Sequence, residues 1–187
     1  MRRRTTLLAI GLALAALTTA RAADIPQAGE KAPDVKLPAV GLEKYLPGKK
    51  SGDTISLKDF QDAKGKNVVL YFYPKAMTRG CTIESCGFRD LADKFAALDT
   101  VVIGISTDTL DAQQKFTDKE KLNFPLIADA NKDAVKTYGA LSPRGLANRY
   151  TFVIDKQGMI RRTYLQVDPA KHPEEVLKFV KENLTKG

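Results

Sequence analysis

The sequence has 187 residues, which suits one domain of ordinary size and is too short for two large ones. A hydrophobic fraction of 43% and a charged fraction of 28% are typical of a folded globular protein and exclude a disordered or collagen-like chain. Two cysteines and a single histidine are too few for the Cys- and His-rich clusters that hold zinc.

The N-terminus has the pattern of a secretory signal peptide. Three arginines at positions 2–4 precede an apolar run over residues 7–17, and small residues follow up to Ala22. The apolar run is about half as long as a membrane span requires. Removing residues 1–22 takes away four arginines and no acid, which lowers the net charge from +8 to +4. We therefore expect an exported domain of residues 23–187 in a bacterial periplasm, bound neither to nucleic acid nor, after signal removal, to a membrane.

The mature chain begins with a stretch rich in Pro and Gly over residues 23–53, which predicts loops and short extended pieces. Continuous apolar runs then predict buried strands, and apolar residues at helical spacing predict amphipathic helices. The predicted strands are 68–73, 101–106, 125–128, 150–154 and 159–165, and the predicted helices are 81–98, 110–122, 132–138 and 173–184.

The order of these elements is β-α-β-α-β-α-β-β-α. Alternating strands and helices require a parallel sheet with right-handed crossovers. The segment Asp155–Gly158 separates the last two strands and predicts a hairpin, which adds antiparallel strands. The fold class is therefore α/β, with a mixed central sheet flanked by helices.

Cys81 follows a buried strand and falls in the first turn of the next predicted helix. The unpaired N–H groups and the positive end of the dipole at a helix start favour an anion there. A thiolate at this position has a lowered pKa, so Cys81 is a candidate nucleophile.

Cys86 lies five residues further along the same predicted helix. In a regular helix these two Cα atoms are about 8–9 Å apart, which exceeds the roughly 4.4–6.8 Å of a disulfide. Either the helix begins after Cys86 and the pair forms a permanent structural disulfide, or the helix unwinds and the pair forms a reversible, redox-active disulfide. The spacing does not fit the Cys-x-x-Cys motif of thioredoxin-type oxidoreductases.

Pro74, Thr78 and Cys81 match the Pro-x-x-x-Thr/Ser-x-x-Cys pattern of the peroxiredoxins. The preceding Tyr71–Lys75 and the second cysteine five residues later resemble the bacterioferritin-comigratory or Q-type branch, and Arg149 begins a segment similar to the family's second signature. The resemblance extends over nearly the whole mature chain. Departures are Arg79, where the family usually has Pro, and an apparent insertion over residues 42–52.

This resemblance implies a thioredoxin-like fold and a thiol peroxidase that reduces hydrogen peroxide or organic hydroperoxides. Cys81 would attack the peroxide, while Arg149 would stabilise the thiolate and the leaving oxygen. Thr78 would hydrogen-bond the peroxide, and Pro74 would shield the site from water. Glu84 would orient Arg149, or alternatively stabilise the helix dipole.

The resemblance also implies that Cys86 attacks the sulfenic acid of Cys81 to form an intramolecular disulfide. This step requires local unwinding, which Gly87 would ease because glycine weakens helices. An external thiol, from a thioredoxin-like protein or a small molecule, would reduce the disulfide. No cofactor or metal is implied, a monomer suffices, and His172 is expected to be a helix cap or a surface residue.

Two alternatives remain. A secreted thioredoxin-like thiol-disulfide oxidoreductase would share the fold but would not explain Thr78 and Arg149. A non-enzymatic secreted domain with one structural disulfide would bind acidic partners.

Overall fold

The computed structural model describes residues 24–61 and 65–184, so the predicted signal peptide lies outside the described residues. Within them, one seven-stranded sheet has the strand order β2-β1-β5-β4-β3-β6-β7. The elements in chain order are β1 Leu37–Val40, β2 Thr54–Ile55, α1 Lys58–Gln61, β3 Asn67–Phe72, α2 Arg79–Ala96, β4 Thr100–Ser106, α3 Leu110–Glu120, β5 Leu126–Ala128, α4 Asp133–Thr137, β6 Thr151–Ile154, β7 Ile160–Tyr164 and α5 His172–Asn183.

The sheet is mixed, as the alternation of elements predicts. Strand β4 pairs in parallel with β3 and β5, while β6 pairs antiparallel with β3 and β7 pairs antiparallel with β6. Every residue of β3 and β4 is buried because helices cover both faces of the sheet. The α/β class with helices flanking a central sheet is therefore confirmed.

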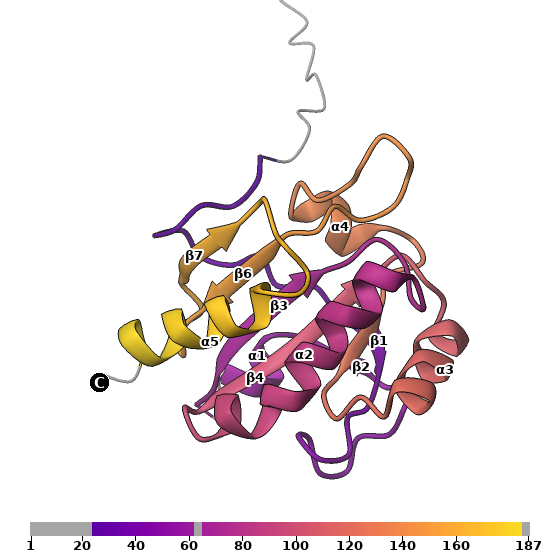
Figure 1. Ribbon diagram of the computed structural model, residues 1–187, viewed down its shortest axis with the longest axis horizontal. Helices are drawn as coiled ribbons and strands as arrows, with labels where there is room; N and C mark the ends of the chain where they lie inside the picture. Colours follow the sequence, from indigo (N-terminus) through magenta and orange to yellow (C-terminus); the bar gives the residue numbers. More distant parts are fainter. Residues whose placement is uncertain (1–23, 62–64, 185–187) are drawn as a thin grey trace, which may run out of the picture.

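Side chains of β3 alternate between two hydrophobic clusters, one on each face of the sheet. Val69 and Tyr71 pack with buried residues of α2, α3 and α5, whereas Val68, Leu70 and Phe72 pack on the opposite face. Cys81 belongs to the first of these clusters. In Figure 1, helices α2 and α5 lie together on the near side of the sheet.

The Pro- and Gly-rich lead-in contains the two short strands β1 and β2 among loops. Strand β1 pairs with both β2 and β5, and so extends the sheet beyond the parallel strands. The predicted hairpin is also present: Asp155 accepts hydrogen bonds from the backbone N–H groups of Gln157 and Met159 at 3.0 and 2.8 Å. Gly158 has a φ of +81°, which a glycine adopts without strain.

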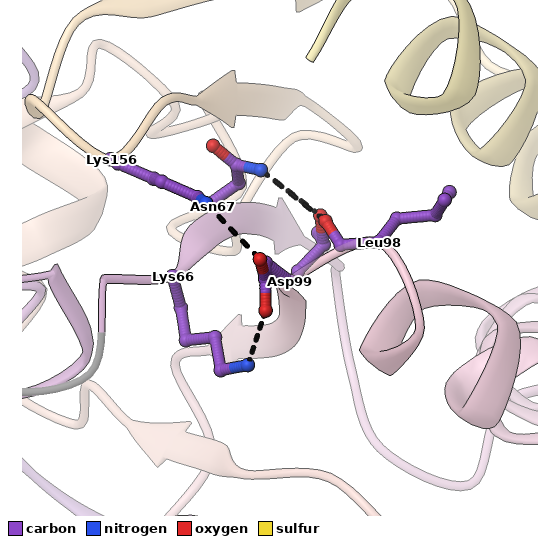
Figure 2. A network of polar contacts seen from close by, with 6 residues as sticks. Lys66, Asn67, Leu98, Asp99 and Lys156 are labelled. Carbon is purple, nitrogen blue, oxygen red and sulfur yellow. Dashed lines mark hydrogen bonds and ion pairs between the residues drawn. The ribbon is translucent and has the colours of Figure 1, made fainter. Parts of the chain in front are cut away.

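A polar network joins the turns at the end of the sheet where β3 and β4 begin (Figure 2). Asp99 accepts hydrogen bonds from Lys66 at 2.9 Å and from Lys156 at 3.1 Å. The side chain of Asn67 donates to the carbonyl of Leu98. The two lysines lower the pKa of Asp99, and because the pairs are exposed each contributes little to stability. In α/β sheets, ligands and catalytic groups gather at the opposite end, where the parallel strands end.

Candidate active site

Cys81 lies at the edge of the sheet where the parallel strands end. The chain leaves β3, passes through residues 73–78 and begins α2 at Arg79, with Thr78 in an extended conformation at the N-cap. Cys81 is therefore in the first turn of α2, as predicted, and its side chain is 1% exposed. The thiol is free.

Asp108 holds the loop that precedes α2. Its carboxylate accepts hydrogen bonds from the backbone N–H of Ala76 and from the hydroxyl of Ser106, both at 2.7 Å. This role was not identified from the sequence, and the N-cap of the following helix α3 is Thr109. The available signal for Asp108 was its position just after β4, whose end lies next to the end of β3.

Arg149 donates a hydrogen bond from Nη2 to the sulfur of Cys81 at 3.3 Å. The sheet brings the two together, because β6 is antiparallel to β3 and Tyr71 pairs with Thr151. The residue just before β6 therefore lies beside the segment just after β3. The structure thus joins the two residues that the sequence motifs singled out separately.

Glu84 lies on the inner side of α2, one turn after Cys81, and its side chain is fully buried. Its Oε2 forms an ion pair with Nη1 of Arg149. Its Oε1 is buried and has no hydrogen-bond partner among the described residues. Burial raises the pKa of Glu84 to about 7 even though Arg149 acts in the opposite direction.

The guanidinium of Arg149 thus spans two groups, the carboxyl of Glu84 and the sulfur of Cys81. Burial disfavours the charge on Arg149, yet Glu84 and Cys81 together raise its pKa above the ordinary value. Arg149 therefore stays cationic beside the thiol. Its positive charge lies within hydrogen-bond distance of the sulfur.

Among the described residues, Thr78 makes no hydrogen bond to the sulfur of Cys81. Its hydroxyl donates to the carbonyl of Lys75 at 2.9 Å, and its side chain makes no hydrogen bond that caps α2. The residue is exposed at the rim of the site. Pro74 is half-buried and lines a cleft of about 390 Å³ together with Pro143, Leu146 and Arg149.

Cys86 lies on the same unbroken helix as Cys81, and its thiol is also free. The regular helix keeps the two Cα atoms about 8–9 Å apart. The thiol of Cys86 donates to Oε2 of Glu120 at 3.7 Å. Burial raises the pKa of Cys86, and Glu120 adds to this increase. The reduced structure therefore does not bring the two sulfurs together, and it excludes a helix that begins after Cys86.

His172 is not on the surface, so that expectation was wrong. It is the first residue of α5, after Lys171 at the N-cap, and it is fully buried. Its Nε2 lies 2.8 Å from the hydroxyl of Thr151, and its ring packs edge-on against Phe88 and Tyr164. Burial, assisted by Arg149, lowers the pKa of His172 to about 4, so the ring is neutral at physiological pH.

In the described part of the chain, no group of three or more His, Cys, Asp or Glu residues is arranged to hold a metal ion. Nor does any helix in that part have the length and apolarity to cross a membrane.

Comparisons with known proteins address the family to which the chain belongs. The model of the AhpC/TSA family matches residues 28–163. Peroxiredoxin Bcp of Bacillus subtilis is 36% identical over 161 residues, which cover 82% of this chain and 94% of that protein. Peroxiredoxin Bcp of Escherichia coli is 34% identical over 164 residues, which cover 84% of this chain and 97% of that protein.

A solved structure agrees as well. The crystal structure of peroxidoxin BcpB from Mycobacterium tuberculosis superimposes with a TM-score of 0.72 at 31% sequence identity, and the match covers 84% of this chain and 97% of that one. The fold, the extent of the family match and the full-length relatives lead to one conclusion: the chain belongs to the AhpC/TSA family and is a peroxiredoxin of the Bcp/PrxQ type, a thiol peroxidase.

Proposed function

We propose that Cys81 is the cysteine that reduces the peroxide. The observation that carries the proposal is the 3.3 Å hydrogen bond from Arg149 to its sulfur. The thiolate attacks one peroxide oxygen, an S–O bond forms, and the O–O bond breaks. The leaving oxygen takes a proton and departs as water or an alcohol, while Cys81 becomes a sulfenic acid. Arg149 stabilises first the thiolate and then the charge that develops on the departing oxygen.

We also propose roles for three residues near Cys81. Glu84 pairs with Nη1 of Arg149 and thereby aims Nη2 at the sulfur. Thr78 is exposed at the rim, where its hydroxyl can turn from the carbonyl of Lys75 to a bound peroxide. Pro74 borders the cleft beside Arg149 and has no N–H group that would hold water there.

In the second step Cys86 closes a disulfide with Cys81. The sulfur of Cys86 displaces the sulfenic hydroxyl, an S–S bond forms, the S–O bond breaks, and water leaves. Because the intact helix separates the sulfurs, α2 unwinds between the two residues before the bond can form. An external dithiol, such as a thioredoxin-like protein, or a pair of small thiols then returns two electrons. The intramolecular bond requires no second subunit, so we propose a monomer.

The test is the stoichiometry of thiol oxidation. The fully reduced protein, mixed with one equivalent of hydrogen peroxide, should lose both thiols and two hydrogen atoms of mass without forming dimers. Cys81→Ser should react no faster than an ordinary thiol. Slow reaction of the wild type with peroxide, together with rapid exchange with protein disulfides, would instead favour a thiol-disulfide oxidoreductase.

We also propose export, which rests on the basic, apolar and small-residue pattern of residues 1–22. A periplasmic fraction that contains a chain beginning at Ala23, as determined by mass spectrometry, would support it. A full-length chain that remains in the cytoplasm would contradict it.

A further inference from the structure

One oxygen of the Asp108 carboxylate joins the loop that precedes α2 to the end of β4. Its Oδ2 accepts a hydrogen bond from the backbone N–H of Ala76 and another from the hydroxyl of Ser106, both at 2.7 Å. The backbone N–H of Asp108 in turn donates to the hydroxyl oxygen of Ser106 at 3.2 Å. Asp108 therefore contacts the loop on one side and the last residue of a central strand on the other.

The anchor behind Asp108 is a buried polar network. Ser106 and Gln113 are both fully buried. Nε2 of Gln113 donates to the hydroxyl oxygen of Ser106 at 3.0 Å and to the carbonyl of Ile127 in β5 at 2.8 Å. The hydroxyl of Tyr73, the first residue after β3, donates to Oε1 of Gln113. Because a buried network with paired members favours one arrangement, β4, β5 and α3 together fix the position of the Asp108 carboxylate.

The loop that Asp108 holds has an uncommon backbone conformation. Met77, the residue after Ala76, has a φ of +62°, in the left-handed region that residues other than glycine seldom adopt. The side chain of Met77 is 42% exposed, so its own packing contributes little to this conformation. Such a conformation persists where neighbouring contacts impose it. The hydrogen bond from Ala76 to Asp108, one residue earlier, is a contact of this kind.

Thr78 follows directly on this part of the loop. It is the N-cap of α2, and its carbonyl accepts a hydrogen bond from the N–H of Thr82 at 2.8 Å. A shift of the loop at Ala76 therefore moves the Thr78 hydroxyl, which the proposed function places beside the peroxide. The hydrogen bond from Arg149 to Cys81 comes from the start of β6 and does not pass through this loop. The position of Thr78 and the stabilisation of the thiolate are therefore separable.

We propose that Asp108 is a positioning residue for the peroxidase reaction: its carboxylate fixes the loop so that Thr78 meets a peroxide bound at Cys81. The inference rests on the proposed roles of Cys81 and Thr78. Asp108 acts through the backbone of Ala76, at a distance from the reacting atoms. A displacement of about 1 Å in a group that positions substrate lowers a rate by up to about 100-fold. Loss of the Asp108 carboxylate therefore slows the reaction with peroxide and leaves the thiolate beside Arg149.

The experiment compares two reactions of the same thiol in the Cys86→Ser background, where Cys81 is the remaining cysteine. Stopped-flow measurement of thiol loss gives the rate with hydrogen peroxide. The pH dependence of alkylation by iodoacetamide reports the thiolate itself and makes no demand on the geometry of a bound peroxide. Asp108→Ala should lower the rate with peroxide by about 10- to 100-fold. It should leave the pH dependence and the rate of alkylation unchanged.

Further variants separate the geometry of Asp108 from its charge. In Asp108→Asn the amide oxygen can accept from both Ala76 and Ser106, so this variant should recover most of the rate with peroxide. Asp108→Glu keeps the charge but moves the carboxylate by one methylene. It should slow the reaction with peroxide, and it decides the matter should Asp108→Ala fail to fold. The matched control is Asp111→Ala in the first turn of α3, where Asp111 forms an exposed ion pair with Lys115.

The outcomes that overturn the proposal are specific. One is a folded Asp108→Ala or Asp108→Glu protein that reacts with peroxide as fast as the Asp111→Ala control. Another is an equal fall in the rates of peroxide reaction and alkylation, and a third is an Asp108→Asn protein as slow as Asp108→Ala. Failure of the Cys86→Ser protein itself to react rapidly with peroxide would instead refute the proposed function, so the two failures are distinguishable.

Discussion

Arg149 Nη2 lies 3.3 Å from the sulfur of Cys81, although 68 positions separate the two residues in the chain. The antiparallel pairing of β6 with β3 creates this contact, because the start of one strand lies beside the end of the other. A half-buried guanidinium therefore takes the place beside the thiol that a histidine occupies in Cys–His enzymes. His172, the single histidine, faces Thr151 instead.

Replacing Arg149 by Met should slow the oxidation of Cys81 by about 100-fold or more, because the variant removes the donor that stabilises charge in the transition state. Arg149→Lys should recover only part of the rate, since one ammonium cannot span both Glu84 and the sulfur. Stopped-flow measurement of thiol loss with hydrogen peroxide gives the rates. Arg161→Met, at an exposed position on β7, is the control and should react like the wild type.

The buried carboxyl of Glu84 should make stability depend on pH. Its pKa is raised from 4.5 to about 7, so the folded protein binds a proton there that the unfolded chain has released. The free energy of unfolding should therefore fall as pH rises from about 4.5 to 7, by up to about 3 kcal/mol from this group. Glu84→Gln should remove this dependence of the unfolding free energy on pH.

Denaturant unfolding of the wild type and the Glu84→Gln variant across this pH range measures the effect as a difference. The comparison is needed because His172, with its lowered pKa, contributes a slope of the opposite sign in both proteins. If the unfolding free energy changes equally with pH in the two proteins, Glu84 is ionised throughout the range.

Glu120 should control the reactivity of Cys86. Because burial and then the nearby carboxylate raise the pKa of this thiol, Glu120→Gln should lower it. The measurement is the pH dependence of alkylation in the Cys81→Ser background, where Cys86 is the remaining thiol. Asp118→Asn, whose carboxylate instead accepts a hydrogen bond from Gln114, is the matched control. If Glu120→Gln leaves the pH dependence of alkylation unchanged, the 3.7 Å contact has no influence on the pKa of Cys86.

The oxidised protein should contain less helix than the reduced protein. The disulfide cannot form across five residues of an intact helix, so closure should cost roughly two turns at the start of α2. Far-ultraviolet circular dichroism before and after one equivalent of peroxide measures the loss, and Cys86→Ser should show none. Identical spectra for the oxidised and reduced wild type would mean that the bond forms without unwinding.

Local patterns were sufficient to predict the central strands and the position of Cys81. Uninterrupted apolar runs indicated β3 and β4, and the strand-to-helix junction placed Cys81 in the first turn of α2. Arg149 was identified by its resemblance to a family signature, because nothing in its own neighbourhood indicates a partner 68 positions away.

The remaining features depend on contacts between distant segments. His172 was expected to be a helix cap or a surface residue, but packing against α2, β6 and β7 buries the ring. Gly87 appeared as a weak point of a helix, yet the ring of Pro173 occupies the space where its Cβ would be. Helix propensity and capping rules concern one segment at a time, so they carry no information about these contacts.

The central claim is that Cys81, beside Arg149, is the residue that peroxide oxidises. The most direct measurement uses reduced Cys86→Ser protein, one equivalent of hydrogen peroxide, a 1,3-dicarbonyl reagent that traps sulfenic acid, and peptide mass spectrometry. We predict rapid and nearly complete labelling at Cys81, with little labelling when Arg149 is also replaced by Met. Labelling of Cys81 no faster than that of an ordinary free thiol would contradict the account.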